Sequence, residues 1–164
     1  MPFNSYIFEG RDINGYRVIN CHLPWSNSRV YWDAGNSGTS SYDRVDQAAN
    51  LEDFSGRWNH WAFTKDVSTG VMNAYLNGSL FMSATGKTRL MEGITSFRIG
   101  GTASSGFNGV YDGKINEFRI WDSALDQATI QSWMYQSVDN SHPNFSNLLA
   151  SYSFDGASGL MASD

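Results

Sequence analysis

Acidic and amide side chains gather around a small polar segment in the first third of the chain. The segment AGNSGTSS spans residues 34–41, and Asp33, Asn36, Asp43 and Asp46 lie in it or beside it. Short side chains that carry carboxylate or amide oxygens can coordinate a calcium ion or accept hydrogen bonds from sugar hydroxyls. The same residue types are also ordinary turn formers. The segment is therefore a candidate ligand site, with plain turn residues as the alternative.

Aromatic side chains offer a second kind of ligand contact, because the apolar face of a sugar ring can stack on an exposed indole or phenol ring. Trp25 and Tyr42 fall in expected turns or edge strands, and Trp32 directly precedes the polar segment. We therefore regard these three as candidates for glycan stacking. The other four tryptophans are predicted to be core or helix-packing residues: Trp58, Trp61, Trp121 and Trp133.

The usual catalytic patterns are absent from the sequence. The three histidines show no metal-ligand spacing, and there is no G-x-S-x-G sequence. Hydrolysis of a glycoside normally requires two carboxylates that face each other across the bond to be cleaved. The nearest acidic pairs, Glu52–Asp53 and Asp112 with Glu117, are better explained as solvated loop and strand-end residues. We predict no enzymatic activity, and a glycoside hydrolase with an unrecognised site is an alternative.

Composition restricts the class of protein further. A chain of 164 residues with 16 glycines, 10 phenylalanines, 8 tyrosines and 6 tryptophans favours one domain of strands and turns. The net charge of -5 argues against nucleic acid as a partner, because phosphate contacts require clustered lysines and arginines. No apolar stretch is long enough to span a bilayer, so membrane insertion is not expected. The single cysteine excludes an internal disulfide.

Alternation of apolar and polar residues predicts an antiparallel β fold. The strongest local signal is the hairpin of Val71–Leu76 and Ser79–Ala84, because the intervening Asn77-Gly78 readily adopts the positive φ angles of a type I′ turn. One helix is expected from about Asp126, which is a suitable N-cap residue. Further strands are expected at residues 6–9, 16–23, 29–33, 42–47, 58–65, 96–100, 114–121 and 148–154.

Between Trp58 and Ile130 the chain carries a series of short motifs in a fixed order. They are W-x-H-x-A-F at 58–63, D-x-x-T-G at 66–70, Y-x-N-G at 75–78, I-G at 99–100, F-x-G at 107–109, I-N-E-F-R-I-W at 115–121 and L-x-x-x-x-I at 125–130. In these residues the chain resembles the LamG-like jelly rolls of the concanavalin A-like lectin/glucanase superfamily. The resemblance implies an all-β, antiparallel β-sandwich (jelly roll) with one short C-terminal helix.

The resemblance also implies a domain organisation. Residues 1–164 are expected to form a single sandwich, with its core motif at 57–135. The opening strand usual in the family is missing at the N-terminus, and a similar pattern occurs instead at residues 149–159. We therefore expect residues 148–154 to pair beside the strand at 114–121 within this chain. The alternative is that residues 148–164 begin a next unit of a longer protein from which the chain was excised.

A metal site is the next implication of the resemblance. The family usually has aspartate where this chain has Asn116, and in related glucanases that carboxylate helps to hold a calcium ion. An amide oxygen can also bind calcium, although the loss of a negative charge weakens such a site. Asn116 and Asp112 are therefore the candidate metal ligands, and Ca²⁺ is a candidate cofactor, without the resemblance requiring it.

The favoured function is a non-catalytic recognition module, carbohydrate-binding or adhesive, which the resemblance places outside the cell or on its surface. The laminarinase-like relatives carry catalytic carboxylates as E-x-D-x-E, and this triplet is absent here. The alternative is a structural protein–protein interaction domain of a surface or virion assembly. The expected partner is a glycan or a protein, and the oligomeric state is open. The candidate ligand-binding residues are Trp25, Trp32, Asp33, Asn36, Tyr42 and Asp43.

Overall fold

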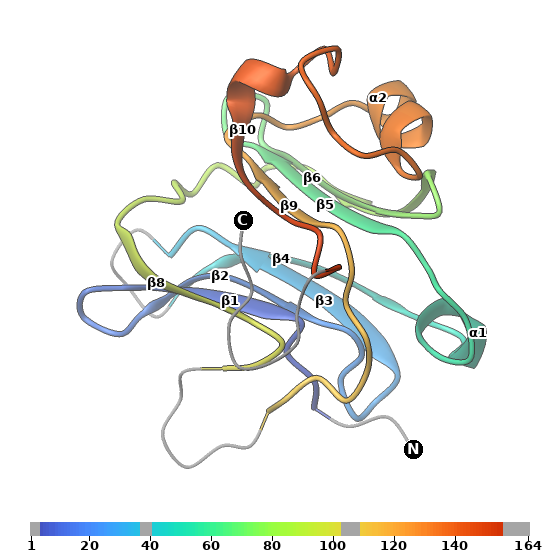
Figure 1. Ribbon diagram of the computed structural model, residues 1–164. Coiled ribbons are helices and arrows are strands. Elements are labelled where there is room, and N and C mark those ends of the chain that lie inside the picture. Colours follow the sequence, from blue (N-terminus) through green and yellow to red (C-terminus); the bar gives the residue numbers. More distant parts are fainter. Residues whose placement is uncertain (1–3, 37–40, 103–108, 156–164) are drawn as a thin grey trace. The chain divides into compact units, whose positions relative to one another are not determined.

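The structure is a computed structural model that describes residues 4–36, 41–102 and 109–155 (Figure 1). The chain divides into two compact units, and the boundary lies between Asp112 and Gly113. Parts of three expected features lie outside the described residues: the polar segment at 37–40, the F-x-G motif at 107–108 and the closing segment at 156–164.

The first unit contains eight strands and one helical turn among its described residues. These elements are β1 (Phe8–Asp12), β2 (Arg17–His22), β3 (Arg29–Ala34), β4 (Asp43–Ala48), α1 (Leu51–Phe54), β5 (Trp61–Asp66), β6 (Val71–Leu76), β7 (Ser79–Ala84) and β8 (Ile94–Ile99). They form a five-stranded sheet in the order β4-β3-β2-β1-β8 and a three-stranded sheet in the order β5-β6-β7. All strand pairs in both sheets are antiparallel.

Register in the five-stranded sheet separates apolar from polar side chains. Phe8 lies opposite Cys21, Cys21 opposite Trp32, and Trp32 opposite Val45, and all four are buried. Because successive residues of a strand point to opposite faces, the next positions along the strands form a row on the other face. That second row is Glu9, Asn20, Asp33 and Arg44. One face of the sheet is therefore apolar and the other strongly polar.

The apolar face packs against the three-stranded sheet. The ring of Phe63 on β5 lies 5.7 Å from that of Trp32 and 5.9 Å from that of Phe8, measured between centroids. The indole Nε1 of Trp32 donates a hydrogen bond of 3.3 Å to the carbonyl oxygen of Thr64. Lys65 on β5 is also buried there, and its Nζ donates to Asp43 Oδ2 at 2.9 Å. These contacts make the antiparallel β-sandwich that the sequence predicts.

The predicted hairpin is present, since β6 and β7 pair on either side of Asn77 and Gly78, whose φ angles are +50° and +77°. The strand expected at 58–65 begins only at Trp61, three residues later than predicted. Residues 58–60 instead follow α1, where the side-chain amide of Asn59 donates to the carbonyl oxygens of Glu52 and Asp53. Alternation of apolar and polar residues alone does not predict this connection, because its contacts leave no period-two pattern in the sequence.

The second unit contains β9 (Phe118–Trp121), α2 (Gln127–Trp133), a short 3₁₀ helix (Phe145–Asn147) and β10 (Leu148–Tyr152). As expected, β10 pairs with β9 within this chain, in an antiparallel register that sets Leu148 opposite Trp121. Helix α2 begins after Asp126, whose side chain accepts a hydrogen bond from the Thr129 amide and so confirms the predicted cap. None of the helices in the described ranges has the length and apolar character required to cross a bilayer.

Candidate functional site

The strongest candidate site is the face of the five-stranded sheet opposite the sandwich core. We call it the polar face. Its members come from β1 to β4 and from Tyr42 just before β4: Glu9, Arg17, Asn20, Arg29, Tyr31, Asp33, Tyr42 and Arg44. Strand pairing brings together side chains that are up to 35 positions apart in the sequence, from Glu9 to Arg44. The site is therefore a product of register rather than of any local motif.

Glu9 is a fully buried carboxylate whose two oxygens are both occupied. Arg11 donates from Nε to Oε2 and from Nη2 to Oε1, each at 2.9 Å. Arg17 Nε donates to Oε1 at 3.3 Å, and the Thr102 hydroxyl donates to Oε2 at 2.7 Å. A buried carboxylate requires such partners, because an uncompensated charge away from water is very unfavourable. Glu9 thus holds two arginines in place.

Asp33 is the second buried carboxylate of the polar face. Arg44 binds it in a bidentate fashion, with Nε to Oδ1 at 2.6 Å and Nη2 to Oδ2 at 2.8 Å. Burial raises the pKa of Asp33, and the hydrogen bonds from Arg44 and the charge of Arg17 oppose that rise. An arginine side chain keeps its proton in proteins, and Asp33 raises the pKa of Arg44 further. The contact is therefore an ion pair.

Tyrosine rings pack against the two arginines that cover these carboxylates. The guanidinium carbon of Arg44 lies 4.7 Å from the ring centroid of Tyr31 and 5.0 Å from that of Tyr42. The guanidinium carbon of Arg17 lies 5.4 Å from the ring of Tyr6, and its Nη2 donates to the Tyr6 hydroxyl at 2.8 Å. Cation–π contacts of this kind fix both partners in orientation. The result is an ordered layer of guanidinium groups and aromatic rings.

Three aromatic rings surround His22 at one end of this layer. Its ring centroid lies 4.2 Å from Tyr6, 4.4 Å from Trp25 and 5.9 Å from Tyr31, each in an edge-to-face arrangement. Its Nδ1 lies 3.2 Å from the Ser5 carbonyl oxygen and its Nε2 lies 3.1 Å from the Asn20 amide nitrogen, so the proton belongs on Nδ1. Burial, followed by the charge of Arg17, lowers the pKa of His22 to about 4. The ring is neutral at pH 7.

Three of the six residues that the sequence suggests as ligand contacts lie in the polar face or beside it. Asp33 lies in its centre and Tyr42 beside Arg44, while Trp25 occupies the turn between β2 and β3 next to His22. The other three proposed residues lie elsewhere. Trp32 is 4% exposed in the sandwich core, Asp43 pairs with Lys65, and Asn36 is buried just after β3. Ligand binding by any of these six residues stays a prediction.

Sequence reasoning missed the other members of the polar face. Glu9, Arg17 and Arg44 have no motif around them, and the sequence predicts Tyr31 only as a strand residue. A partial signal was the alternation in 16–23, because Ile19, Cys21 and Leu23 form an apolar row and leave Asn20 and His22 on the other face. Which rows adjoin could not be derived, since that depends on strand order and register.

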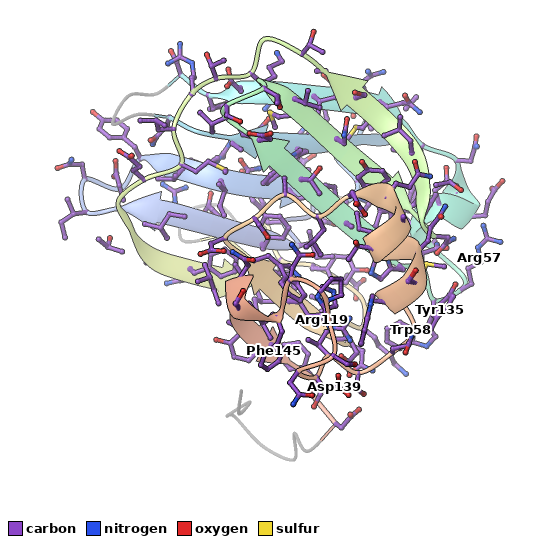
Figure 2. The ribbon with its side chains drawn as sticks, turned by 90° about the horizontal axis from the view of Figure 1, so that it is seen from above. Arg57, Trp58, Arg119, Tyr135, Asp139 and Phe145 are labelled. Atoms are coloured by element: carbon purple, nitrogen blue, oxygen red, sulfur yellow. The ribbon has the colours of Figure 1, made fainter. Side chains whose placement is uncertain are left out.

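Exposed aromatic residues occur outside the polar face in both units. Trp58 was predicted to be a core residue, and this is wrong, because its side chain is 65% exposed in the loop after α1. Arg57 beside it donates from Nε to the Glu52 carbonyl oxygen at 3.1 Å (Figure 2). In the second unit Tyr135, just after α2, and Phe145 are exposed as well (Figure 2). Among the described residues of the second unit, Arg119 forms an ion pair with Glu117, whose side chain is 36% exposed and so is less buried than that of Glu9 or Asp33.

The proposed metal ligands do not gather into a site within either unit. Asp112 and Asn116 are both exposed and fall on opposite sides of the boundary between the units. In the ranges 4–36, 41–102 and 109–155, no three His, Cys, Asp or Glu side chains are grouped so as to hold a metal ion. Calcium prefers six to eight oxygen ligands. Calcium binding by Asp112 and Asn116 stays a prediction, and no part of the polar face depends on it.

Comparisons with known proteins bear on this fold. A family model described as the concanavalin A-like lectin/glucanases superfamily matches residues 4–131. No curated protein matches the chain. A solved structure from Bacteroides ovatus ATCC 8483, provisionally assigned as a carbohydrate-binding protein, superposes with a TM-score of 0.72 at 18% identity. The match covers 98% of this chain but only 44% of that one, so this chain spans less than half of its length.

A second solved structure is an S-layer domain-containing protein of Clostridium thermocellum ATCC 27405. It is 21% identical, and the match covers 82% of this chain and 65% of that one, with a TM-score of 0.39. Nothing is inferred from so loose a superposition. At 18% identity the first structure indicates a shared fold, and its ligand is a separate question.

Proposed function

Because this chain belongs to the concanavalin A-like lectin/glucanase superfamily, we propose that it is a non-catalytic module that binds carbohydrate at the polar face. The observation that carries the proposal is the layer of Arg17, Arg44 and tyrosine rings held over the buried carboxylates Glu9 and Asp33. The provisional assignment of the Bacteroides ovatus structure to carbohydrate binding supports the same direction at the level of fold.

The chemistry of this layer suits a sugar. Tyrosine rings offer an apolar face for the C–H side of a pyranose and a hydroxyl group for hydrogen bonding. Guanidinium groups offer several N–H donors in a fixed plane to sugar oxygens. Since ion pairs and ring contacts already hold these side chains, a ligand loses less free energy in ordering them. Tyr31, Tyr42 and Arg44 are the partly exposed members that we expect to contact it.

The same geometry supports a function without catalysis. Glu9 and Asp33 both lie near Arg17, whose Nε is 3.3 Å from Glu9 Oε1 and whose Nη1 is 3.8 Å from Asp33 Oδ2. Hydrolysis of a glycoside would require two such carboxylates to face the bond that is cleaved. Their side chains, however, are only 0% and 1% exposed, and arginines occupy their oxygens. A general acid or a nucleophile must reach the substrate, and these two cannot.

A glycan-binding module of this kind is expected to work outside the cell or on its surface, where its polysaccharide ligands are found. Protein docking is the second candidate function, and the observation that favours it is the 65% exposure of Trp58. A protein partner that docks there would not depend on the polar face. The two functions therefore respond to different substitutions.

The decisive experiment is a glycan array with the purified chain at high density, followed by calorimetry on any glycan that binds, in calcium and in EDTA. We expect Tyr42→Ala to weaken binding at least tenfold, because it removes a ring from the layer and a hydrogen-bond acceptor from Arg44. Tyr135→Ala is the matched control, since this exposed tyrosine lies after α2 in the second unit. An array without signal, or equal loss in both variants, contradicts the proposal.

A further inference from the structure

Positive charge is concentrated on the polar side of the five-stranded sheet. Five of the 11 lysines and arginines of the chain project there: Arg11, Arg17, Arg29, Arg44 and Arg98. Three carboxylates share that side: Glu9, Asp33 and Asp46. Five positive and three negative charges leave a net charge of +2 on this side of an otherwise acidic chain, whose total is -5. Antiparallel pairing thus separates charges that are mixed along the sequence.

Four of these arginines pair with carboxylates and differ in how far that pairing occupies them, whereas Arg98 donates from Nη1 to the Thr102 carbonyl oxygen. Arg11 and Arg17 are committed to Glu9, and their side chains are mostly buried. Arg44 and Arg29 are each 37% exposed. Arg44 uses Nε and Nη2 for Asp33 and Tyr42, and Arg29 uses Nε and Nη2 for Asp46. Within the described part of the chain the Nη1 groups of both have no hydrogen-bond partner.

These two arginines lie along the same pair of strands. Arg44 on β4 lies opposite Asp33 on β3. Arg29 lies on β3 itself, four residues before Asp33 and opposite Ala48. At about 3.4 Å per residue, the two positions are about 14 Å apart along the strand. Tyr31 lies between them, with its ring beneath the guanidinium of Arg44. Asp46, which lies opposite Tyr31, holds Arg29, so the guanidinium groups of both arginines reach toward the same part of β3.

We propose that the ligand of the polar face is an acidic glycan whose carboxylate or sulfate groups bind Nη1 of Arg44 and Nη1 of Arg29. This inference rests on the proposed function and specifies the class of its substrate. Guanidinium groups match the geometry of carboxylate and other oxyanions. The buried carboxylates are already neutralised, so the charge that remains for a ligand is positive. Two anion contacts on separate arginines also favour a glycan that carries more than one acidic group.

The test measures binding by calorimetry to three soluble polymers: polygalacturonate, dextran sulfate and unmodified dextran. We expect at least tenfold tighter binding to one of the two acidic polymers than to dextran, and weaker binding as salt concentration rises. The two acidic arms distinguish a uronate ligand from a sulfated one. Equal binding to dextran and to both acidic polymers overturns the inference, as does equally tight binding to single-stranded DNA, which would indicate nonspecific attraction of anions.

Two substitutions in the Arg29–Asp46 ion pair are expected to change binding to the acidic polymer in opposite directions. Arg29→Gln removes one anion contact and is expected to weaken binding to the acidic polymer about tenfold. Asp46→Asn releases Arg29 from its ionic partner and is expected to strengthen binding to the same polymer severalfold. Both residues are partly exposed, so neither change threatens folding. Arg57→Gln, in the loop after α1, is the control with unchanged binding.

The outcomes separate this inference from the proposed function. If dextran or another neutral glycan binds and Tyr42→Ala abolishes that binding, while Arg29→Gln and Asp46→Asn have no effect, the acidic ligand is wrong and the module still binds sugar. If no glycan of any class binds, both are wrong. If Arg29→Gln weakens and Asp46→Asn strengthens binding to an acidic polymer, and neither affects a neutral one, both the proposed function and the acidic ligand are supported.

Discussion

Single residues of the polar face show how buried charge is compensated in this protein. Asp33 and Glu9 are carboxylates removed from water, and every oxygen on them has a cationic partner. Removal of one partner of such a pair is more destabilising than the pair is stabilising, because the remaining charge stays buried. The arginines of the polar face therefore have a structural role as well as the proposed one in binding.

Arg44→Ala is expected to lower the free energy of unfolding by about 2 kcal/mol, less than for a fully buried pair because Arg44 is partly exposed. The physical reason is that Asp33 loses its bidentate partner while it stays covered. Urea denaturation at pH 7 measures the effect. Arg57→Ala is the control and should change the stability by less than about 0.5 kcal/mol. Equal stability of the two variants would show that Asp33 is compensated in some other way.

His22 makes stability depend on pH. Its pKa is lowered from 6.5 to about 4 in the folded protein, so the folded state favours the neutral ring and binds fewer protons than the unfolded state between these values. The contribution of His22 is therefore complete above about pH 6.5 and is lost as the pH falls towards 4. Its size is about 3 kcal/mol.

Urea denaturation at pH 7.0, 6.0, 5.0 and 4.5 tests this on the wild type and on His22→Asn. Other groups titrate in the same range, so the informative quantity is the difference between the two proteins at each pH. We expect the wild type to lose its advantage over the variant progressively as the pH falls below 6.5. A difference that stays constant over this range would contradict a lowered pKa at His22.

Among the elements, the end of β3 is joined to the second sheet of the first unit by the side chain of Lys65. Lys65 Nζ on β5 donates to the carbonyl oxygens of Ala34 and Arg89 as well as to Asp43, at 3.0, 2.7 and 2.9 Å. Gly35 follows β3 at this point, with a φ angle of +78°. A side chain at Gly35 would meet this junction directly, because an added Cβ would lie 2.4 Å from the Arg89 carbonyl oxygen.

Gly35→Ala is expected to destabilise the protein by well over 2 kcal/mol, because it combines a left-handed backbone conformation with overlap against backbone atoms. Gly15→Ala is a closely matched control: its φ angle is +80° and no atom lies within 4 Å of the added Cβ. That control should lose only about 1–2 kcal/mol. Thermal and urea unfolding compare the two, and similar losses would show that the junction near Gly35 can move aside.

Comparison of individual strands and helices shows which of them the sequence predicts correctly. The Asn77-Gly78 hairpin, the N-cap at Asp126 and the pairing of β10 with β9 were predicted and are present, because local turn and cap chemistry or a recognisable motif specifies each. The start of β5 and the exposure of Trp58 were predicted incorrectly. There the contacts of Asn59 and Arg57 with the end of α1 override the alternation.

At the scale of the whole molecule, charge is distributed unevenly. The chain carries a net charge of -5, yet the polar side of the five-stranded sheet carries +2. A local field of opposite sign to the total charge can draw an anionic ligand to one surface, while the remaining surface repels it. The distribution of charge, more than the total charge, thus determines where an acidic glycan would bind.

The sequence by itself determined the fold class, because alternation, turn residues and the motifs between Trp58 and Ile130 act over short distances or in a fixed order. It also indicated Asp33, Tyr42 and Trp25, which lie at the polar face. Only the tertiary structure decided that Glu9, Arg17 and Arg44 join them and that Trp32 does not. The reason is physical: register and strand order place distant residues on a common face, and a shift of one residue would exchange the two faces.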